Sequence, residues 1–260
     1  MRYTIVKNEY KDSLKKAEKI IKVLKDYNWI EDKLNPEVIF VIGGDGTFLT
    51  AAEQYNHILD NVLFIPVKSG GIGFYTNHNR IEDIKKRIDG LKRTKPLLIP
   101  LLEANHYKAI NEIKILNSKR PLRASVLIND ELLEEFKGTG LAFTTPSGST
   151  GFSKSQGGAV IIDETNIFQM LEMAPVSNNI FRTIHAPIIL SKNHHIKVIL
   201  DGIKDVEIIV DGVSNKVPEN GIVNVCLSSK HVKLVSAQNE HTTKIQILKD
   251  MFTLNKKFED

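Results

Sequence analysis

The sequence predicts an α/β N-terminal domain with a parallel, Rossmann-like sheet, followed by a strand-rich, all-β C-terminal domain. Three observations lead to this fold class. Buried-strand runs alternate with amphipathic helix patterns up to about residue 98, which is typical of βαβ units. Beyond that point, short strand-like runs follow one another with turn residues between them. Twelve of the sixteen glycines also lie in four clusters, which indicates places where the backbone turns sharply or approaches another group.

The N-terminal domain is expected to cover residues 1–98 and to alternate strands with helices. Its central strand, Val38-Ile39-Phe40-Val41-Ile42, is an uninterrupted apolar run, as expected for a strand buried on both faces. Asn79 is placed to cap the last helix of the domain. The predicted strands are 3–6, 38–42 and 62–67, and the predicted helices are 14–24, 48–54 and 81–91.

The C-terminal domain is expected to cover residues 99–240 and to consist mainly of short strands. One helix is predicted within it, over residues 166–173. Residues 241–260 follow the domain as a C-terminal tail. One arrangement compatible with the sequence is that this tail packs back on the N-terminal domain. The predicted strands are 104–110, 112–116, 123–128, 141–145, 195–200, 206–210, 223–227 and 232–235.

The composition is that of an ordinary globular protein, with 42% hydrophobic and 25% charged residues. The net charge of +4 is too small to argue for nucleic acid or a membrane surface as a partner. Apolar runs stay well short of the roughly 18 residues of a transmembrane helix, and the first thirty residues lack a signal-peptide pattern. The single cysteine, Cys226, cannot form an internal disulfide, so we expect a cytoplasmic protein.

The sequence Gly43-Gly44-Asp45-Gly46-Thr47 directly follows the central strand of the N-terminal domain. Glycines lack a Cβ atom and let backbone N–H groups approach an oxyanion, and the N-terminus of the following helix favours phosphate. A carboxylate in such a place has two possible tasks, holding Mg²⁺ through water or accepting a proton from an attacking hydroxyl. The simpler alternative is a Gly-Asp-Gly turn between strand and helix.

Several common functional motifs are absent from the sequence. It contains neither a Walker A loop nor the G-x-G-x-x-G dinucleotide fingerprint, and the spacing of a serine-hydrolase elbow is not met. These absences disfavour the usual nicotinamide-dependent dehydrogenases. The eight histidines form no metal-ligand pattern, so no metal site is predicted from a direct side-chain cluster.

A second motif runs from Thr144 to Ser155 and is followed by Gly157-Gly158. The segment is rich in hydroxyl groups and can wrap a polar ligand with side-chain and backbone hydrogen bonds. A flexible surface turn is the alternative, but apolar runs bracket the segment on both sides. Asn111-Glu112 is a weaker signal for a ligand site. The two polar side chains could bind a sugar diol, but an ordinary exposed pair explains them equally well.

Together, the two motifs resemble the NAD kinase family, and closely its compact bacterial form. Further landmarks agree in order and spacing, and the resemblance extends from Val38 to about Gly212. The first motif alone is shared with diacylglycerol-type lipid kinases and phosphofructokinases. The second motif, together with Asn111-Glu112, is what distinguishes the NAD kinase family from them. The landmarks are Gly70-Gly71-Ile72-Gly73-Phe74, Asn111-Glu112, Ile128-Asn129-Asp130-Glu131 and Val210-Asp211-Gly212.

The resemblance implies transfer of a phosphoryl group from ATP to the 2′-hydroxyl of the adenosine ribose of NAD, giving NADP. It also implies Mg²⁺ or another divalent ion as cofactor, small-molecule nucleotides as partners, and a homodimer or homotetramer. Asp45 is then the candidate base, and the residues that cradle the phosphates of ATP are Gly43, Gly44, Gly46 and Thr47. The residues expected to contact NAD are Asp45, Gly46, Phe74, Tyr75, Asn111, Glu112, Lys137, Thr139, Ser147, Thr150, Gly151, Phe152, Ser153, Lys154, Ser155 and Ala174.

Three positions depart from the family pattern. Thr139 occupies the place of a usual aspartate, Phe152 that of a usual tyrosine, and Gly151 that of a usual alanine. A threonine hydroxyl cannot form an ion pair with a cationic nicotinamide ring, so the choice between NAD and NADH stays open. The donor, ATP or polyphosphate, and regulation by NADP also stay open. Two alternatives remain, a lipid or sugar kinase with the same glycine motif and a non-catalytic or weakly active dinucleotide sensor.

Overall fold

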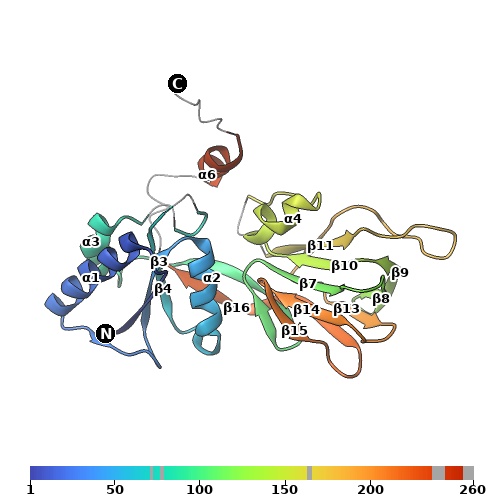
Figure 1. Cartoon of the computed structure of the whole chain (residues 1–260), viewed down its shortest axis with the longest axis horizontal. Helices are drawn as coiled ribbons and strands as arrows, with labels where there is room; N and C mark the ends of the chain where they lie inside the picture. Colours follow the sequence, from blue (N-terminus) through green and yellow to red (C-terminus); the bar gives the residue numbers. More distant parts are fainter. Residues whose placement is uncertain (71–72, 77–78, 163–165, 236–243, 254–260) are drawn as a thin grey trace. The chain divides into compact units, whose positions relative to one another are not determined.

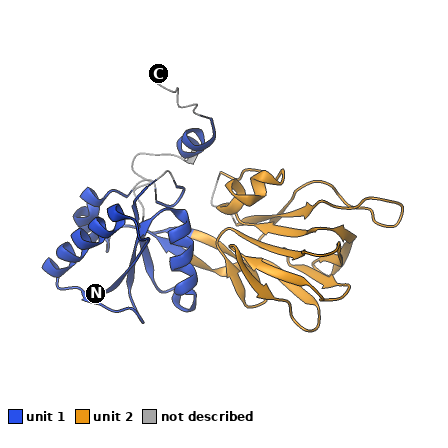
Figure 2. Cartoon of the chain, viewed as in Figure 1, with its two compact units in different colours: residues 1–98, 232–260 blue, residues 99–231 orange. Residues whose placement is uncertain are grey.

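The computed structural model of the chain describes residues 1–70, 73–76, 79–162, 166–235 and 244–253. The chain forms two compact units, which Figure 2 shows in different colours. Unit 1 combines residues 1–98 with 232–260, and unit 2 is residues 99–231. None of the helices in the described ranges is long and apolar enough to cross a membrane.

Unit 1 is built on a parallel sheet with the strand order β2-β1-β3-β4-β16. Its central strand β3 is buried along its whole length, as the apolar run predicts. The parallel N-terminal sheet is therefore confirmed. The strands are β1 (Arg2–Lys7), β2 (Ile30–Glu31), β3 (Val38–Gly43), β4 (Leu63–Lys68) and the end of β16 (Ile222–Leu234).

Helices cover both faces of this sheet (Figure 1). On one face, α1 and α3 pack against Phe40 and its neighbours in β3, with Ile20 and Leu24 of α1 fully buried. On the other face, Phe48 of α2 lies 5.6 Å from Phe64 of β4, measured between ring centroids. The helical segments are α1 (Lys11–Asp26), α2 (Asp45–Gln54), η1 (Asn56–Ile58), η2 (Ile81–Asp83), α3 (Ile84–Gly90), α6 (Lys244–Leu248) and the π-helical η4 (Lys249–Thr253).

Asn79 does not cap the helix that follows it, contrary to the prediction. The side-chain amide of Asn79 donates a hydrogen bond of 2.9 Å to the carbonyl oxygen of Val235. The residue is buried, with 2% of its surface exposed. Asn79 therefore holds the chain just after β16 in unit 1. Without its amide, the buried carbonyl of Val235 would lose this hydrogen-bond donor.

Unit 2 contains two antiparallel arrays of strands with one apolar core between them. One array has the order β16-β13-β8-β9, with β5 and β6 attached through β16, and the other has the order β12-β11-β10-β7-β14-β15. Their inward side chains form one cluster, which includes Val126 and Phe136 of the first array and Phe143 and Ile208 of the second. The strands are β5 (Leu97–Ala104), β6 (Tyr107–Ala109), β7 (Glu112–Asn117), β8 (Leu122–Ile128), β9 (Glu131–Gly138), β10 (Gly140–Thr144), β11 (Ile167–Met173), β12 (Ile188–Ser191), β13 (Ile196–Leu200), β14 (Val206–Val210) and β15 (Val213–Lys216).

Some predicted elements of the second half are wrong in type or extent. A helix is predicted over residues 166–173, but residues 167–173 of this run form strand β11, which pairs with β10 and β12. The run 104–110 is interrupted by a turn at Asn105, which has a φ of 55°, between β5 and β6. The two strands expected at 223–227 and 232–235 are one strand of 13 residues, β16. Strands β9, β12 and β15 were not predicted, nor was β5 apart from its last residue, Ala104.

Candidate functional site

Asp45 is the first residue of helix α2, directly after Gly44 at the end of strand β3. Its carboxylate accepts hydrogen bonds from the backbone N–H groups of Phe74, at 2.7 Å, and Tyr75, at 3.0 Å. Burial raises the pKa of Asp45 above the ordinary value, and these backbone donors oppose the rise. The side chain is thus held in one place by unit 1 itself, with its basicity increased.

The glycines around Asp45 serve two different purposes. A Cβ atom on Gly73 would lie 2.5 Å from Oδ1 of Asp45, and one on Gly43 would lie 2.2 Å from Oγ1 of Thr47. These two glycines therefore make room for side chains of the motif. Cβ atoms on Gly44 and Gly46 would meet no atom within 4 Å. The backbone at these two positions borders open space, as the phosphate-cradle hypothesis requires.

Phe74 and Tyr75 lie beside this motif, but their rings have different surroundings. Tyr75 is 6% exposed and its ring stacks on Phe48, with the ring centroids 4.6 Å apart. Phe74 is partly exposed, and its ring centroid lies 6.4 Å from that of Phe252 in η4. Of these two predicted contacts, Phe74 is the one with a partly accessible ring. Gly71 and Ile72, two of the family landmarks, lie outside the described residues.

The backbone of Asn111 and Glu112 is fixed in unit 2 by Asp211, one of the landmarks of the family resemblance. The carboxylate of Asp211 accepts hydrogen bonds from the backbone N–H groups of Ile110, at 2.7 Å, Asn111, at 2.8 Å, and Glu112, at 3.0 Å. Asp211 has a φ of 45° and Gly212 a φ of 93° in the turn between β14 and β15. An Asp-Gly pair is a sequence signal for such a hairpin turn. The backbone groups that the carboxylate binds are about a hundred positions away in the chain, so the sequence signal does not reveal them.

Glu112 belongs to a short chain of interactions on the same side of unit 2. Its carboxylate lies 3.6 Å from Nζ of Lys114, and that Nζ lies 4.3 Å from the centre of the Phe152 ring. Burial and then the nearby Asp211 raise the pKa of Glu112, whereas Lys114 lowers it. The geometry places Phe152, one of the three departures from the family pattern, in a cation–π contact.

Much of the hydroxyl-rich loop is engaged in holding its own shape. Thr145 Oγ1 donates to the carbonyl oxygen of Ile110, at 2.5 Å, and accepts from the N–H of Gly148, at 3.1 Å. Ser149 and Ser153 are fully buried, and Oγ of Ser153 accepts a hydrogen bond of 2.9 Å from Gln169. A Cβ on Gly148 would collide with the backbone of Asn111, 2.2 Å from its carbonyl oxygen. The loop is therefore fastened to the Asn111 segment.

The remaining loop residues are more accessible. Gly151, Lys154 and Ser155 are exposed, and Ser147, Thr150 and Phe152 are partly buried. They belong to or border two short helical turns, η3 (Gly148–Thr150) and α4 (Phe152–Ser155). Of the predicted loop contacts, these accessible residues are the ones available to a ligand, whereas the buried Ser153 acts within the protein.

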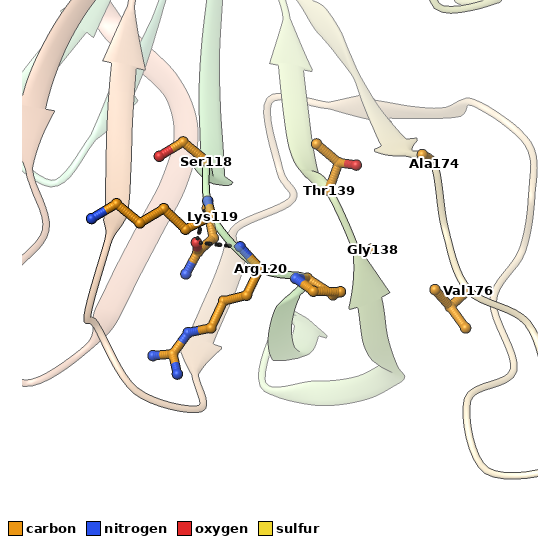
Figure 3. Close-up of a pocket in the computed structure, with 9 residues that line it drawn as sticks. Ser118, Lys119, Arg120, Gly138, Thr139, Ala174 and Val176 are labelled. Carbon is orange, nitrogen blue, oxygen red and sulfur yellow. Dashed lines mark hydrogen bonds between the residues drawn. The ribbon is translucent and has the colours of Figure 1, made fainter.

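Thr139 and Ala174 lie at the other end of strand β10 from this loop. They line a cavity of about 380 Å³, shown in Figure 3 together with Gly138 and Val176. The facing wall is the turn between β7 and β8, which carries Asn117, Ser118, Lys119, Arg120 and Pro121. The dashed lines in Figure 3 join Oδ1 of Asn117 to the backbone N–H groups of Lys119 and Arg120.

Lys137 lies two positions before Thr139, on β9. Its Nζ is 5.3 Å from the centre of the Phe181 ring, and its carbonyl oxygen accepts a hydrogen bond of 2.7 Å from the N–H of Val176. The structure thus groups the predicted NAD contacts of unit 2 into two sets. One set surrounds Asn111 and the hydroxyl-rich loop, and the other surrounds Thr139, separated by the five residues of β10.

Comparison with known proteins gives relatives across most of the chain. The family model described as the ATP-NAD kinase C-terminal domain matches residues 111–237 of this chain. The NAD kinase of Lactobacillus acidophilus is 40% identical over 210 residues, which cover 76% of this chain and 78% of that protein. The NAD kinase of Enterococcus faecalis is 37% identical over 213 residues, which cover 77% of this chain and 80% of that protein.

Two solved structures share the fold. A crystal structure of yeast NADH kinase complexed with NADH has a TM-score of 0.79 and 20% identity, and covers 99% of this chain and 89% of that one. A crystal structure of an NAD kinase from Archaeoglobus fulgidus in complex with ATP has a TM-score of 0.74 and 20% identity, and covers 92% of this chain and 95% of that one. These likenesses confirm the α/β domain followed by a strand-rich domain.

Proposed function

Because this chain belongs to the NAD kinase family, it transfers a phosphoryl group from ATP to NAD, and we propose that Asp45 is its catalytic base. The acceptor is the 2′-hydroxyl of the adenosine ribose, and the product is NADP. The observation that carries the proposal is the position of Asp45. Its carboxylate is fixed by two backbone N–H groups at the start of α2, and burial raises its pKa.

In the proposed reaction, the ribose 2′-oxygen forms a bond to the γ-phosphorus of ATP while the bond from that phosphorus to the β,γ-bridging oxygen breaks. ADP leaves, and the hydroxyl proton passes to the carboxylate of Asp45. Phosphoryl transfer depends on positioning and charge neutralisation more than on covalent chemistry by the protein. A carboxylate whose pKa lies above its ordinary value is a better proton acceptor for this purpose.

The phosphates of ATP are assigned to the start of α2. The backbone of Gly44 and Gly46 borders open space, and α2 is a helix of ten residues with free N–H groups at its first turn. Such an N-terminus favours an anion through both its N–H groups and its dipole. Gly43 and Thr47 shape this turn, because the side chain of Thr47 occupies the place of the missing Cβ of Gly43.

We assign NAD to the two sets of residues in unit 2 and to Phe74. Asn111 and Glu112 are candidates for ribose or nicotinamide-side groups, and the accessible loop residues from Ser147 to Ser155 for the adenosine half. Phe74 offers a partly exposed ring for the adenine, whereas the ring of Tyr75 is buried against Phe48. Ser153 contributes by holding the loop to Gln169.

The two sets at opposite ends of β10 bear on the assembly of the enzyme. One dinucleotide must reach both ends of this strand, or the sets must serve ligands shared with a second copy of the chain. We propose a homodimer or homotetramer on this basis and from the family resemblance. The single cysteine, Cys226, is the ground on which we propose the cytoplasm as its compartment. Light scattering of the purified protein measures the mass in solution, and a monomer would contradict the proposal.

Mg²⁺ is the proposed cofactor. Among the described residues, no group of three or more His, Cys, Asp or Glu side chains is arranged to hold a metal ion. Mg²⁺ is commonly bound largely through substrate phosphates, so the phosphates of ATP are its proposed ligands, and Asp45 is kept as the proposed base. When bound, the cation would neutralise charge on the phosphates of ATP.

The function is tested by incubating the purified protein with ATP, Mg²⁺ and NAD or NADH and detecting phosphorylated product. We expect formation of NADP from NAD, measured with an NADP-specific dehydrogenase. A parallel reaction with NADH shows whether a site with the neutral Thr139 side chain also accepts the uncharged, reduced nicotinamide ring. Failure to phosphorylate either dinucleotide would overturn the proposal and favour a non-catalytic sensor.

A further inference from the structure

A second cavity in unit 2, of about 490 Å³, is lined by no residue of the Asp45 motif or of the hydroxyl-rich loop, and it includes Lys137 of the set around Thr139. It lies beside the Thr139 cavity, and the two share Asn117, Arg120 and Pro121. We call it the cationic cavity. Its lining residues are Asn117, Arg120, Pro121, Leu122, Arg123, Lys137, Asp201, Gly202 and Val206.

The lining of the cationic cavity has an excess of positive charge. Arg120, Arg123 and Lys137 contribute three cations, and Asp201 contributes the single carboxylate. Arg123 and Lys137 are direct partners in the register of β8 and β9. Like charges directly opposite each other on neighbouring strands destabilise a sheet, so an anion between these side chains would relieve a repulsion built into the fold.

The ion pair that the cavity already contains is a loose one. The Arg123 guanidinium lies 3.9 Å from the carboxylate of Asp201, and both side chains are more than half exposed, at 54% and 73%. Exposed ion pairs of this kind contribute little to stability. Arg123 is therefore available to a stronger anionic partner, for which a guanidinium offers two parallel N–H donors.

The backbone that carries Arg120 is well fixed. Asn117 is 6% exposed, and its Oδ1 accepts hydrogen bonds from the N–H groups of Lys119, at 3.0 Å, and Arg120, at 3.1 Å. Its Nδ2 donates a bond of 3.0 Å to the carbonyl oxygen of Lys204. This turn holds Arg120 beside β8, so the cost of ordering it around a ligand is reduced.

From these observations, we propose that the cationic cavity binds the phosphate group of a small organic phosphate monoester. Such a group carries a charge of about −1.5 to −2 at pH 7, which matches the excess of two positive charges in the lining. The cavity volume lies within the range of about 300–1,000 Å³ typical of small-molecule sites. Pro121, Leu122 and Val206 supply apolar surface for the organic part.

The test is a titration of the ¹⁵N-labelled full-length protein with ribose 5-phosphate, followed by the amide shifts of Leu122, Gly202 and Val206. We expect saturable shifts of these amides, and none with ribose at the same concentrations. Equal shifts with ribose, or none with ribose 5-phosphate at millimolar concentration, would overturn the proposal. Inorganic phosphate forms a third arm, and binding as tight as that of the ester would show a free-ion site instead.

Two variants separate ligand binding from a structural ion pair. Arg123→Gln should weaken binding of ribose 5-phosphate about tenfold, because a charge-assisted hydrogen bond is lost. Asp201→Asn should tighten it two- to threefold, because it removes the one anionic group of the lining. Weakening by both variants would indicate that the pair only maintains the structure, and would overturn the assignment.

Arg93→Gln is the matched control, since it removes an exposed arginine of unit 1 and changes the net charge equally. It should leave the titration unchanged, and a loss equal to that of Arg123→Gln would mean that overall charge, rather than this cavity, attracts the ligand. No turnover is measured in these experiments. Their outcome is therefore independent of whether Asp45 acts as a catalytic base.

Discussion

The carboxylate of Asp45 is held on the backbone of the segment that starts at Gly73. Gly73 leaves no room for a side chain, and the next two N–H groups point to the two oxygens of Asp45. At the scale of single residues, the candidate base is thus positioned by main-chain atoms of unit 1. Two substitutions test the charge and the position of this group separately.

Asp45→Asn should lower kcat by about 10²–10⁴-fold, the usual contribution of a general base, while the Kd for NAD changes much less. The amide is nearly isosteric but cannot accept the hydroxyl proton. The raised pKa predicts that kcat in the wild type falls as the pH drops through a value above that of an ordinary aspartate. Steady-state kinetics and NAD titration measure both quantities, and equal losses in the two would make Asp45 a binding residue.

Gly73→Ala should lower kcat about a hundredfold, because the new Cβ would lie 2.5 Å from Oδ1 of Asp45 and 2.8 Å from Oγ1 of Thr76. Displacement of a catalytic group by about 1 Å can have an effect of this size. Gly90→Ala is the matched control, since its Cβ would meet only Oγ1 of Thr94, at 3.4 Å. Wild-type kcat in Gly73→Ala would show that the position of the carboxylate is not critical.

At the scale of elements, the turn between β14 and β15 organises the start of β7. The Asp211 carboxylate accepts three backbone N–H groups from the Ile110–Glu112 segment, and charged acceptors form the stronger class of hydrogen bond. This arrangement connects the stability of unit 2 with the position of the Asn111 side chain.

Asp211→Asn should lower the free energy of unfolding by about 1–2 kcal/mol and weaken NAD binding, because the backbone donors lose a charged acceptor. Urea denaturation and NAD titration are the measurements. Asp130→Asn is the control, because Asp130 also has a positive φ, of 65°, but its side chain is exposed and pairs with Lys197. Similar effects from the two variants would show that Asp211 has no special role.

The sequence was sufficient to predict the parallel strands of unit 1 and the place of Asp45, because these follow from apolar runs and glycines that are local in the chain. It was insufficient for β11, where Gln, Met, Leu and Glu are good helix formers. Pairing with β10 and β12 overrides that propensity. The roles of Asn79 and Asp211 depend on partners 156 and about 100 positions away, which no local pattern reveals.

At the scale of the whole molecule, stability should depend on the protonation of Glu134, a buried glutamate of unit 2 that lies beside the half-buried Glu172. Glu134 of β9 is 5% exposed, and burial together with the adjacent Glu172 raises its pKa to about 8. Glu172 in turn accepts backbone hydrogen bonds from Ile184, at 3.0 Å, and His185, at 3.2 Å. Glu172 therefore anchors the segment before β12, and the raised pKa of Glu134 favours the protonated form of Glu134 beside it.

The pKa of Glu134 is higher in the folded chain than the ordinary value of 4.5, so its contribution to stability is present below pH 4.5 and is lost as the pH rises toward about 8. Glu134→Gln keeps a donor toward Glu172 without a proton to release. We expect this variant to exceed the wild type in stability by about 1–2 kcal/mol at pH 8 and to match it near pH 4.5.

Urea denaturation at the two pH values measures the difference. Glu135→Gln is the matched control, because Glu135 is the next residue along β9 but is exposed. If Glu134→Gln follows the same pH dependence as the wild type, Glu134 does not titrate in this range.

Strand β16 starts in unit 2, antiparallel to β13, and ends in unit 1, parallel to β4. During translation, the ribosome has completed β4 and the whole of residues 99–231 before Lys233 and Leu234 emerge to pair with β4. Until then, the nascent sheet of unit 1 has an open edge at β4, the kind of surface that recruits other strands. Unit 2 can finish folding first, and the unit that is synthesised first is therefore completed last.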